Sequence, residues 1–216
     1  MSGTSIDGID AAFLKTDGLF HVETGEAITV PYAVDLRKTL SELVSSGKQS
    51  KTVEEQITVK HAEVISQLLK KTNTAVVEID LIGFHGHTIY HKPAQRKTLQ
   101  IGDGELLAKL TGVDVVCDFR SNDVKNGGQG APLVPLYHQA LAVRLEKPLA
   151  ILNLGGVANI TWLGHKDELL AFDTGPGNAL LDDYMDMHLG EKQDTGGKLA
   201  LSGNVDQSIL ATLLEH

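Results

Sequence analysis

The stretch LNLGGVANIT, residues 152–161, decides the fold class, because it sets a glycine pair between two apolar strands at the start of the second half of the chain. A related arrangement opens the sequence, where MSGTSIDGID, residues 1–10, places glycines beside hydroxyl and carboxylate side chains ahead of another strand. One glycine hairpin is only a turn. Two of them, each opening its own unit of strands and helices, indicate two lobes that hold one phosphate-bearing ligand between them.

Apolar segments on both sides of these stretches alternate between strand-like and helix-like patterns. We expect strands at 9–14, 26–30, 79–84, 98–101, 113–117, 149–156, 157–163 and 169–173, and helices at 33–46, 53–71, 105–112, 134–145, 178–189 and 205–214. A capping box at Thr52 and Glu55 predicts the start of the longest helix. The alternation is typical of an α/β fold in two parts. The polar, glycine-rich segment 121–132 predicts a boundary between domains 1–125 and 126–216.

The composition is that of an ordinary globular chain, with 42% hydrophobic and 22% charged residues among 216. The 19 basic and 28 acidic side chains give a formal charge of −9, which argues against nucleic acid or an anionic membrane as a partner. No apolar run approaches the roughly 20 residues that cross a bilayer. The single cysteine, Cys117, excludes an internal disulfide, and its apolar neighbours predict a buried side chain. Together with an N-terminus unlike a secretory signal, this predicts a cytoplasmic protein.

The N-terminal glycine loop can wrap around phosphate oxygens, with hydroxyl donors at Thr4 and Ser5 and close backbone approach at Gly3. It lacks the lysine of a Walker loop. The alternative interpretation is a simple strand turn built on Asp7 and Gly8.

The segment FDTGPGN, residues 172–178, follows a predicted strand and precedes a predicted helix. Asp173 is therefore expected at the carboxyl end of that strand, where α/β sheets place functional carboxylates. Such a group could act as a general base. The alternative is that Asp173 only caps the following helix.

The segment GFHGHTIYHKP, residues 83–93, contains three histidines and is expected to form a loop after a strand. No second cluster with metal-ligand spacing accompanies it, so hydrogen bonding to a ligand or to the backbone is favoured over metal binding. Further along, Arg120 is the best candidate for a cation that faces a carboxylate or phosphate. The alternative is an ion pair of Arg120 with Asp118 or Asp123.

Six stretches together resemble one family closely, the anhydro-N-acetylmuramic acid kinases. They are MSGTSIDGID, GFHGHTIYHKP, QIGDGELLAKLTG, VVCDFRSNDVKNGGQGAPLVP, LNLGGVANIT and FDTGPGN. The resemblance implies a two-lobed, actin-like ATPase of the α/β class, with RNase-H-like lobes. The family places a short strand ahead of MSGTS and continues beyond residue 216. The chain is therefore expected to hold a nearly complete first lobe and part of the second.

The resemblance also implies the chemistry. The family uses ATP and Mg²⁺ to convert 1,6-anhydro-N-acetylmuramic acid into N-acetylmuramic acid 6-phosphate, opening the anhydro bridge with water, in peptidoglycan recycling in the cytoplasm. The implied partners are the amino sugar and ATP, with a homodimer as the family's assembly. The competing hypothesis is a non-catalytic sugar- or nucleotide-binding module of the same fold.

Functional residues follow from the same resemblance, position by position. Asp173 matches the catalytic base. The ATP-binding residues would be Gly3, Thr4, Ser5, Ile6, Asp7, Gly8, Ile9 and Asp10. Sugar-binding candidates are His85, Asp118, Arg120, Gly155 and Gly156, and no residue is expected to ligate a metal.

Overall fold

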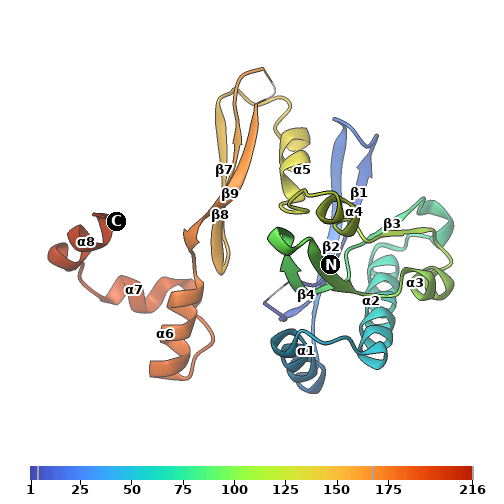
Figure 1. Cartoon of the computed structure of the whole chain (residues 1–216), viewed down its shortest axis with the longest axis horizontal. Helices are drawn as coiled ribbons and strands as arrows, with labels where there is room; N and C mark the ends of the chain where they lie inside the picture. Colours follow the sequence, from blue (N-terminus) through green and yellow to red (C-terminus); the bar gives the residue numbers. More distant parts are fainter. Residues whose placement is uncertain (4, 167, 216) are drawn as a thin grey trace. The chain divides into compact units, whose positions relative to one another are not determined.

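A computed structural model describes residues 1–3, 5–166 and 168–215, and it has the mixed α/β structure that the sequence predicts. The chain packs as two compact units, Met1–Leu145 and Glu146–His216 (Figure 1). Each unit has its own strands and helices. The assignment of lobes to residues 1–125 and 126–216 stays a prediction.

The first unit contains three pairs of strands. An antiparallel pair is formed by β1 (Gly8–Thr16) and β2 (Val22–Pro31), and a second by β4 (His87–Lys92) and β5 (Lys97–Ile101). The strands β3 (Ile82–Phe84) and β6 (Val115–Cys117) pair in parallel. The helices are α1 (Val34–Ser46), α2 (Lys51–Thr72), α3 (Gly104–Thr111), α4 (Ser121–Lys125) and α5 (Val134–Leu141), with short 3₁₀ turns η1 (Val76–Glu78) and η2 (Pro93–Gln95).

Helix α2 supplies much of the core of this unit. Its buried side chains include Val53, Ile57, Val64 and Leu68, which recur at helical spacing. The first three of them join a cluster with residues of α1, β1, β4 and β5. The helix begins at Lys51, two residues before the predicted start at 53. Ser50 is the N-cap, and its hydroxyl accepts a hydrogen bond from the backbone N–H of Val53 at 3.4 Å. The prediction of a cap at Thr52 was wrong because Ser50 offers the same hydroxyl in an extended conformation.

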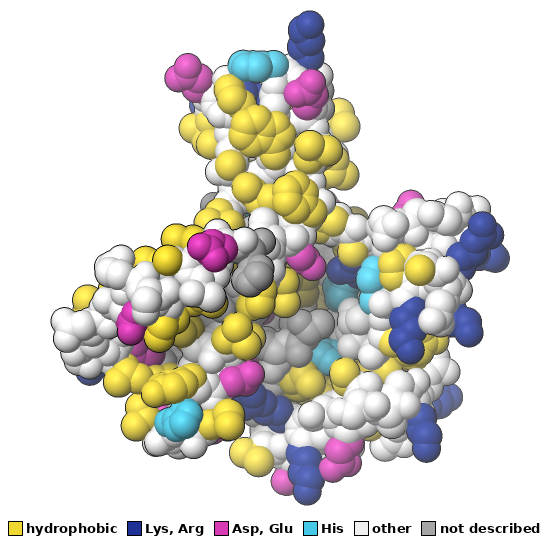
Figure 2. Space-filling model, turned by 60° about the vertical axis from the view of Figure 1, so that its left-hand side comes forward, with side chains coloured by type: hydrophobic (Ala, Val, Ile, Leu, Met, Phe, Trp, Pro, Cys, Tyr) yellow, Lys and Arg dark blue, Asp and Glu magenta, His cyan; other side chains and the backbone are white. Residues whose placement is uncertain are grey.

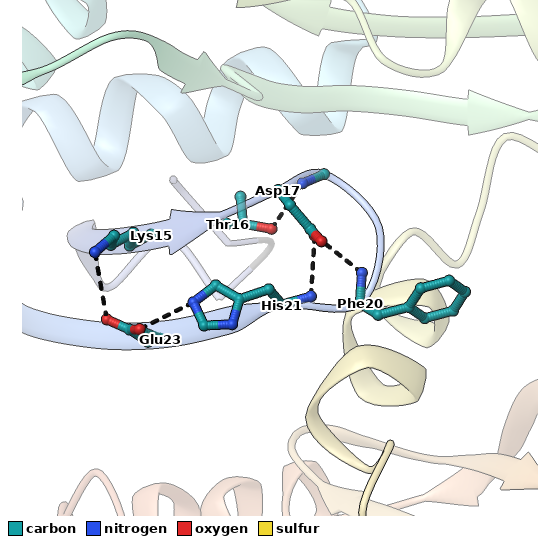
Figure 3. Close-up of polar contacts among 7 residues, drawn as sticks. Lys15, Thr16, Asp17, Phe20, His21 and Glu23 are labelled. Atoms are coloured by element: carbon teal, nitrogen blue, oxygen red, sulfur yellow. Dashed lines mark hydrogen bonds and ion pairs between the residues drawn. The ribbon is translucent and has the colours of Figure 1, made fainter.

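The turn between β1 and β2 is closed by one carboxylate (Figure 3). Asp17 Oδ1 accepts hydrogen bonds from the backbone N–H groups of Leu19, Phe20 and His21 at 2.9, 3.0 and 2.9 Å. Led by the bond from Leu19, these contacts lower the pKa of Asp17. These bonds fix the turn that joins the two strands.

The second unit is built on an antiparallel sheet in the order β7 (Leu149–Leu154), β8 (Val157–Leu163) and β9 (Leu169–Pro176). The helices that follow are α6 (Ala179–Leu189), α7 (Lys198–Ser202) and α8 (Gln207–Leu214), with the 3₁₀ turn η3 (Thr195–Gly197). Strand β9 runs three residues beyond the predicted end at Asp173, because Gly175 and Pro176 still pair with β8.

The two faces of this sheet differ in character. One face carries four apolar side chains that are 56–59% exposed: Leu152, Leu154, Leu170 and Phe172. Figure 2 shows hydrophobic side chains gathered over this sheet at the top of the view. Residues paired across antiparallel strands lie on the same face. The register therefore places Asn153, Asn159 and Asp173 in one polar row on the opposite face.

Three local predictions need correction. The expected histidine loop at 83–93 is mostly strand, because His87–Lys92 form β4 with alternating burial. Cys117 is exposed rather than buried, since it ends the short strand β6. The glycine-rich segment 121–132 begins with helix α4.

No helix among the described residues has the length and apolar character needed to cross a membrane.

Candidate functional site

The glycine pair Gly155–Gly156 forms the turn between β7 and β8. Its carbonyl groups also accept hydrogen bonds from the residues that lead into α6. The backbone N–H of Gly177 donates to Gly156 O at 2.9 Å, and that of Asn178 donates to Gly155 O at 2.8 Å. The side-chain amide of Asn178 donates to Leu154 O at 2.8 Å. The backbone N–H of Ala179 adds a longer bond to Gly156 O at 3.3 Å. The connection from β9 to α6 is therefore fastened to the glycine turn and to the end of β7.

Glycine is required at position 177 by this close approach. A Cβ there would lie 2.2 Å from Gly155 O, whereas a Cβ on Gly156 would meet nothing closer than Ala179 Cβ at 3.8 Å. We expect Gly177→Ala to lower the free energy of unfolding of the second unit by about 2 kcal/mol, because the backbone must shift to relieve the clash. Urea unfolding followed by Trp162 fluorescence measures this effect.

Gly156→Ala is the matched control, since it adds the same methyl group in open space on the same turn. It should change the free energy of unfolding by less than about 0.5 kcal/mol. Equal losses in the two variants would contradict the structural reason given for Gly177.

Asp173 lies inside β9 and is exposed. The expectation that it ends a strand was wrong, and the rule for parallel sheets does not apply because this sheet is antiparallel. The capping alternative is also wrong, since Asn178 holds the N-cap position of α6. Asp173 instead pairs in register with Asn159, close to the glycine turn, because Pro176 pairs with Val157 at the same end of the sheet.

Two asparagines of this row, Asn153 and Asn159, were missed as site candidates in the sequence. Their signal was present, since each interrupts an otherwise apolar strand, in LNL and in ANI. The register places them beside each other on β7 and β8. The row thus offers two amides and one carboxylate on one face, a combination that can bind hydroxyl groups or orient a water.

The N-terminal loop precedes β1. Ile6 N–H donates to Gly3 O at 3.1 Å, and the Ser5 hydroxyl donates to Asp7 Oδ1 at 2.8 Å. The Ser5 and Asp7 side chains are exposed, whereas the Ile6 side chain is buried in the core. Thr4 lies outside the described residues. Among its described residues, this loop therefore presents the Ser5 hydroxyl and the Asp7 carboxylate to its surroundings.

The other predicted ATP-binding residues belong to β1 itself: Gly8, Ile9 and Asp10. Ile9 is a core residue, and a Cβ on Gly8 would lie 2.6 Å from Val30 O, so both serve the packing of β1 on β2. Asp10 Oδ1 accepts a hydrogen bond from Thr29 Oγ1 at 2.6 Å. The assignment of Gly8, Ile9 and Asp10 to ATP binding stays a prediction.

His85 and Arg120 form a second polar cluster in the first unit. Arg120 Nε donates to His85 Nε2 at 2.9 Å, and Arg120 Nη1 donates to Gly130 O at 2.6 Å. Burial lowers the pKa of His85, so its ring is neutral and Nδ1 carries the proton, which it donates to Gly86 O. Among the described residues Arg120 forms no ion pair, so the alternative of a pairing with Asp118 or Asp123 was wrong.

The two acids near Arg120 have different places. Asp123 Oδ2 accepts from Gly130 N–H at 2.7 Å and so shapes the glycine loop. Asp118 is exposed and has a left-handed backbone conformation, with φ of 56°. The structure thus joins His85 to Arg120 by a hydrogen bond and leaves the side chain of Asp118 exposed.

Among the residues that the structure describes, no three His, Cys, Asp or Glu side chains form a group that could hold a metal ion. In the described part of the N-terminal loop, the exposed acidic group is the carboxylate of Asp7.

Comparison with known proteins gives a consistent result. A family model described as anhydro-N-acetylmuramic acid kinase matches residues 1–216. Three curated relatives with that name match the whole chain: it is 51% identical to the protein of Paramagnetospirillum magneticum, 49% to that of Rhodospirillum rubrum and 45% to that of Rhizorhabdus wittichii. The chain spans 61%, 58% and 62% of the lengths of these relatives. With a family model that covers every residue, the chain belongs to the anhydro-N-acetylmuramic acid kinase family.

Proposed function

We propose that this chain is part of an ATP-dependent sugar kinase that converts 1,6-anhydro-N-acetylmuramic acid into N-acetylmuramic acid 6-phosphate. The observation that carries the proposal is the match of the family model over residues 1–216. The proposed architecture is the two-lobed, actin-like ATPase fold. Its support is that a glycine loop opens the first unit and the Gly155–Gly156 turn lies in the second.

The N-terminal loop is the proposed site for the nucleotide. ATP supplies the phosphoryl group, and Mg²⁺ neutralises its charge. The chemistry of the exposed groups fits a magnesium nucleotide, since the Ser5 hydroxyl can donate to a phosphate oxygen and the Asp7 carboxylate can take part in holding the cation.

On the sugar side, Asp173 is the proposed general base. It would take a proton from a water that attacks the anomeric carbon, while the bond from that carbon to the bridging oxygen breaks. The released sugar oxygen then attacks the γ-phosphorus of ATP, and ADP leaves. Asn153 and Asn159 lie in the same row as Asp173 and can orient the water or a sugar hydroxyl.

His85 and Arg120 are proposed to contact the sugar. Their mutual hydrogen bond and the bond from Arg120 to Gly130 O fix the guanidinium, which keeps further N–H groups for a ligand carboxylate or hydroxyl. The substrate carries a lactyl carboxylate, which a planar guanidinium can bind with two parallel hydrogen bonds. Asp118, Gly155 and Gly156 remain further candidates for sugar contacts. A cytoplasmic role in peptidoglycan recycling and a homodimeric assembly complete the proposal.

The full-length protein should consume ATP only when the anhydro sugar and Mg²⁺ are both present. Mass spectrometry should find a product heavier than the sugar by one phosphoryl group and one water. In heavy-oxygen water, the label should enter at the anomeric carbon and not the phosphate, because water opens the bridge and the sugar's own oxygen receives the phosphoryl group.

N-acetylmuramic acid, which has no anhydro bridge, is the matched control acceptor. Turnover with this control at the same rate would contradict the coupling between bridge opening and transfer. No turnover of the anhydro sugar above background would remove the assignment.

A further inference from the structure

The hydroxyl group of Ser2 is held inside the first unit by two side chains that are distant in the sequence, Tyr32 and His87. Tyr32 directly follows β2, and its hydroxyl donates to Ser2 Oγ at 2.8 Å. Nδ1 of His87, the first residue of β4, lies 2.8 Å from the same Ser2 Oγ. Ser2 is 3% exposed, Tyr32 9% and His87 0%. Three polar side chains therefore form one buried chain of hydrogen bonds.

The first bond of this chain has a defined direction, since the Tyr32 hydroxyl donates to Ser2 Oγ. The second bond joins Ser2 Oγ and His87 Nδ1, and either atom can be its donor, because a serine oxygen has one proton and two acceptor lone pairs. Burial is the main cause that lowers the pKa of His87. The chain of hydrogen bonds therefore runs from Tyr32 through Ser2 to His87 with either tautomer of the ring.

Tyr32 also contacts the far end of the N-terminal loop. Its backbone N–H donates to Asp7 O at 3.1 Å, while its hydroxyl holds Ser2. Met1 adds a main-chain pair with Asp10, in which Asp10 N–H donates to Met1 O at 2.8 Å. The segment between Ser2 and Asp7 is thus fastened at both ends to a single residue of the core.

We propose that Tyr32, Ser2 and His87 are positioning residues, which hold the described part of the N-terminal loop (residues 3 and 5–7) in the shape that receives the phosphates of ATP. The inference rests on the proposed function of that loop. Buried hydroxyl and imidazole groups add little net stability compared with apolar side chains of the same shape. Their use here is to order the loop before the nucleotide arrives, so that binding does not bear the entropic cost of ordering it.

Tyr32→Phe in the full-length protein tests the inference, because it removes one hydroxyl and keeps both the ring and the backbone bond to Asp7. We expect the KM for ATP to rise about fivefold to tenfold, with kcat and the KM for the sugar changed by less than about twofold. Ser2→Ala should have the same effect. Calorimetric titration with the magnesium complex of ATP gives the affinity directly.

A double-mutant cycle separates positioning from general stability. If Tyr32 acts through Ser2, the double variant Tyr32→Phe, Ser2→Ala should bind ATP as weakly as either single variant and no worse. Ser2→Thr keeps a hydroxyl and should restore most of the affinity. His87→Leu extends the test to the third member, and the Tyr32 and Ser2 variants decide the question if that protein does not fold.

Tyr90→Phe is the matched control. Tyr90 lies in β4 and its ring packs against the same core, so the change removes the same atom close by. It should leave the KM for ATP unchanged. The inference would be overturned by an unchanged affinity for ATP in Tyr32→Phe and Ser2→Ala, or by additive losses of affinity in the double variant. In both cases an active wild type would leave the proposed function in place. A wild type that binds no ATP would remove both.

Discussion

Asp173→Asn in the full-length protein should lower kcat for 1,6-anhydro-N-acetylmuramic acid by about a thousandfold, because an amide cannot accept the proton of the attacking water. The two side chains have nearly the same shape. Asp173 is exposed in β9, so the substitution buries no unpaired group and should leave the sheet intact. ADP release measures kcat, and Trp162 fluorescence during urea unfolding measures the stability of the same sheet.

Asp183→Asn is the matched control for this experiment. Asp183 is an exposed carboxylate of α6 in the same unit, so its loss makes the same change in net charge. We expect its kcat to stay within about twofold of the wild type. If Asp173→Asn retained the wild-type kcat, Asp173 would be excluded as the base. If only the KM for the sugar rose, its role would be binding and not proton transfer.

Much of the fold could be predicted because its signals are local. The apolar stripe of α2, with Ile57 and Leu68 on its buried face, repeats at the helical period within one segment. The turn at Gly155 and Gly156 is set by the two glycines and by the apolar strands that flank them. In both cases neighbouring residues carry the whole pattern. The alternating pattern of β4, buried at His87 and Ile89, was equally local, but the preceding glycine and histidine suggested a loop.

The arrangement of the candidate site depends on contacts between residues that are distant in the sequence. Arg120 binds His85, 35 positions earlier, and not the acids beside it, because the chain brings the ends of β3 and β6 together in parallel. The hydrogen bond between Ser2 and His87 joins residues 85 positions apart. The row that contains Asp173 exists only through the register of an antiparallel sheet. Residue types and their spacing along the chain carry no information about these pairings.

The histidines inside the first unit should make its stability depend on pH. His61 lies in α2 and is 3% exposed, and its Nδ1 donates to Ile57 O at 2.7 Å. Burial lowers the pKa of His61 from 6.5 to about 4, with smaller contributions from the N-terminal amine and from His87 and His85. The folded protein therefore keeps this ring neutral at a pH where the unfolded chain protonates it.

The sign of the effect follows from the protons bound in each state. Between the unfolded pKa of 6.5 and the folded pKa of about 4, the unfolded chain binds more protons at His61, so stability falls as the pH falls. The contribution is complete above the unfolded pKa. It should decrease by about 3 kcal/mol between about pH 7.5 and about pH 4, at 1.36 kcal/mol for each unit of pKa difference.

Urea unfolding followed by far-ultraviolet circular dichroism, repeated across this pH range, measures the effect. His61→Leu keeps an apolar side chain at the buried position and should remove about 3 kcal/mol of the pH dependence, whatever its own stability at neutral pH. His21→Leu is the matched control, because His21 lies exposed in the turn before β2 and pairs with Glu23, and it should leave the pH dependence as in the wild type. If His61→Leu and the wild type lost the same free energy of unfolding on acidification, protonation of the His61 ring would not destabilise the folded state. Water would then have to reach Nε2, which is buried with no hydrogen-bond partner among the described residues.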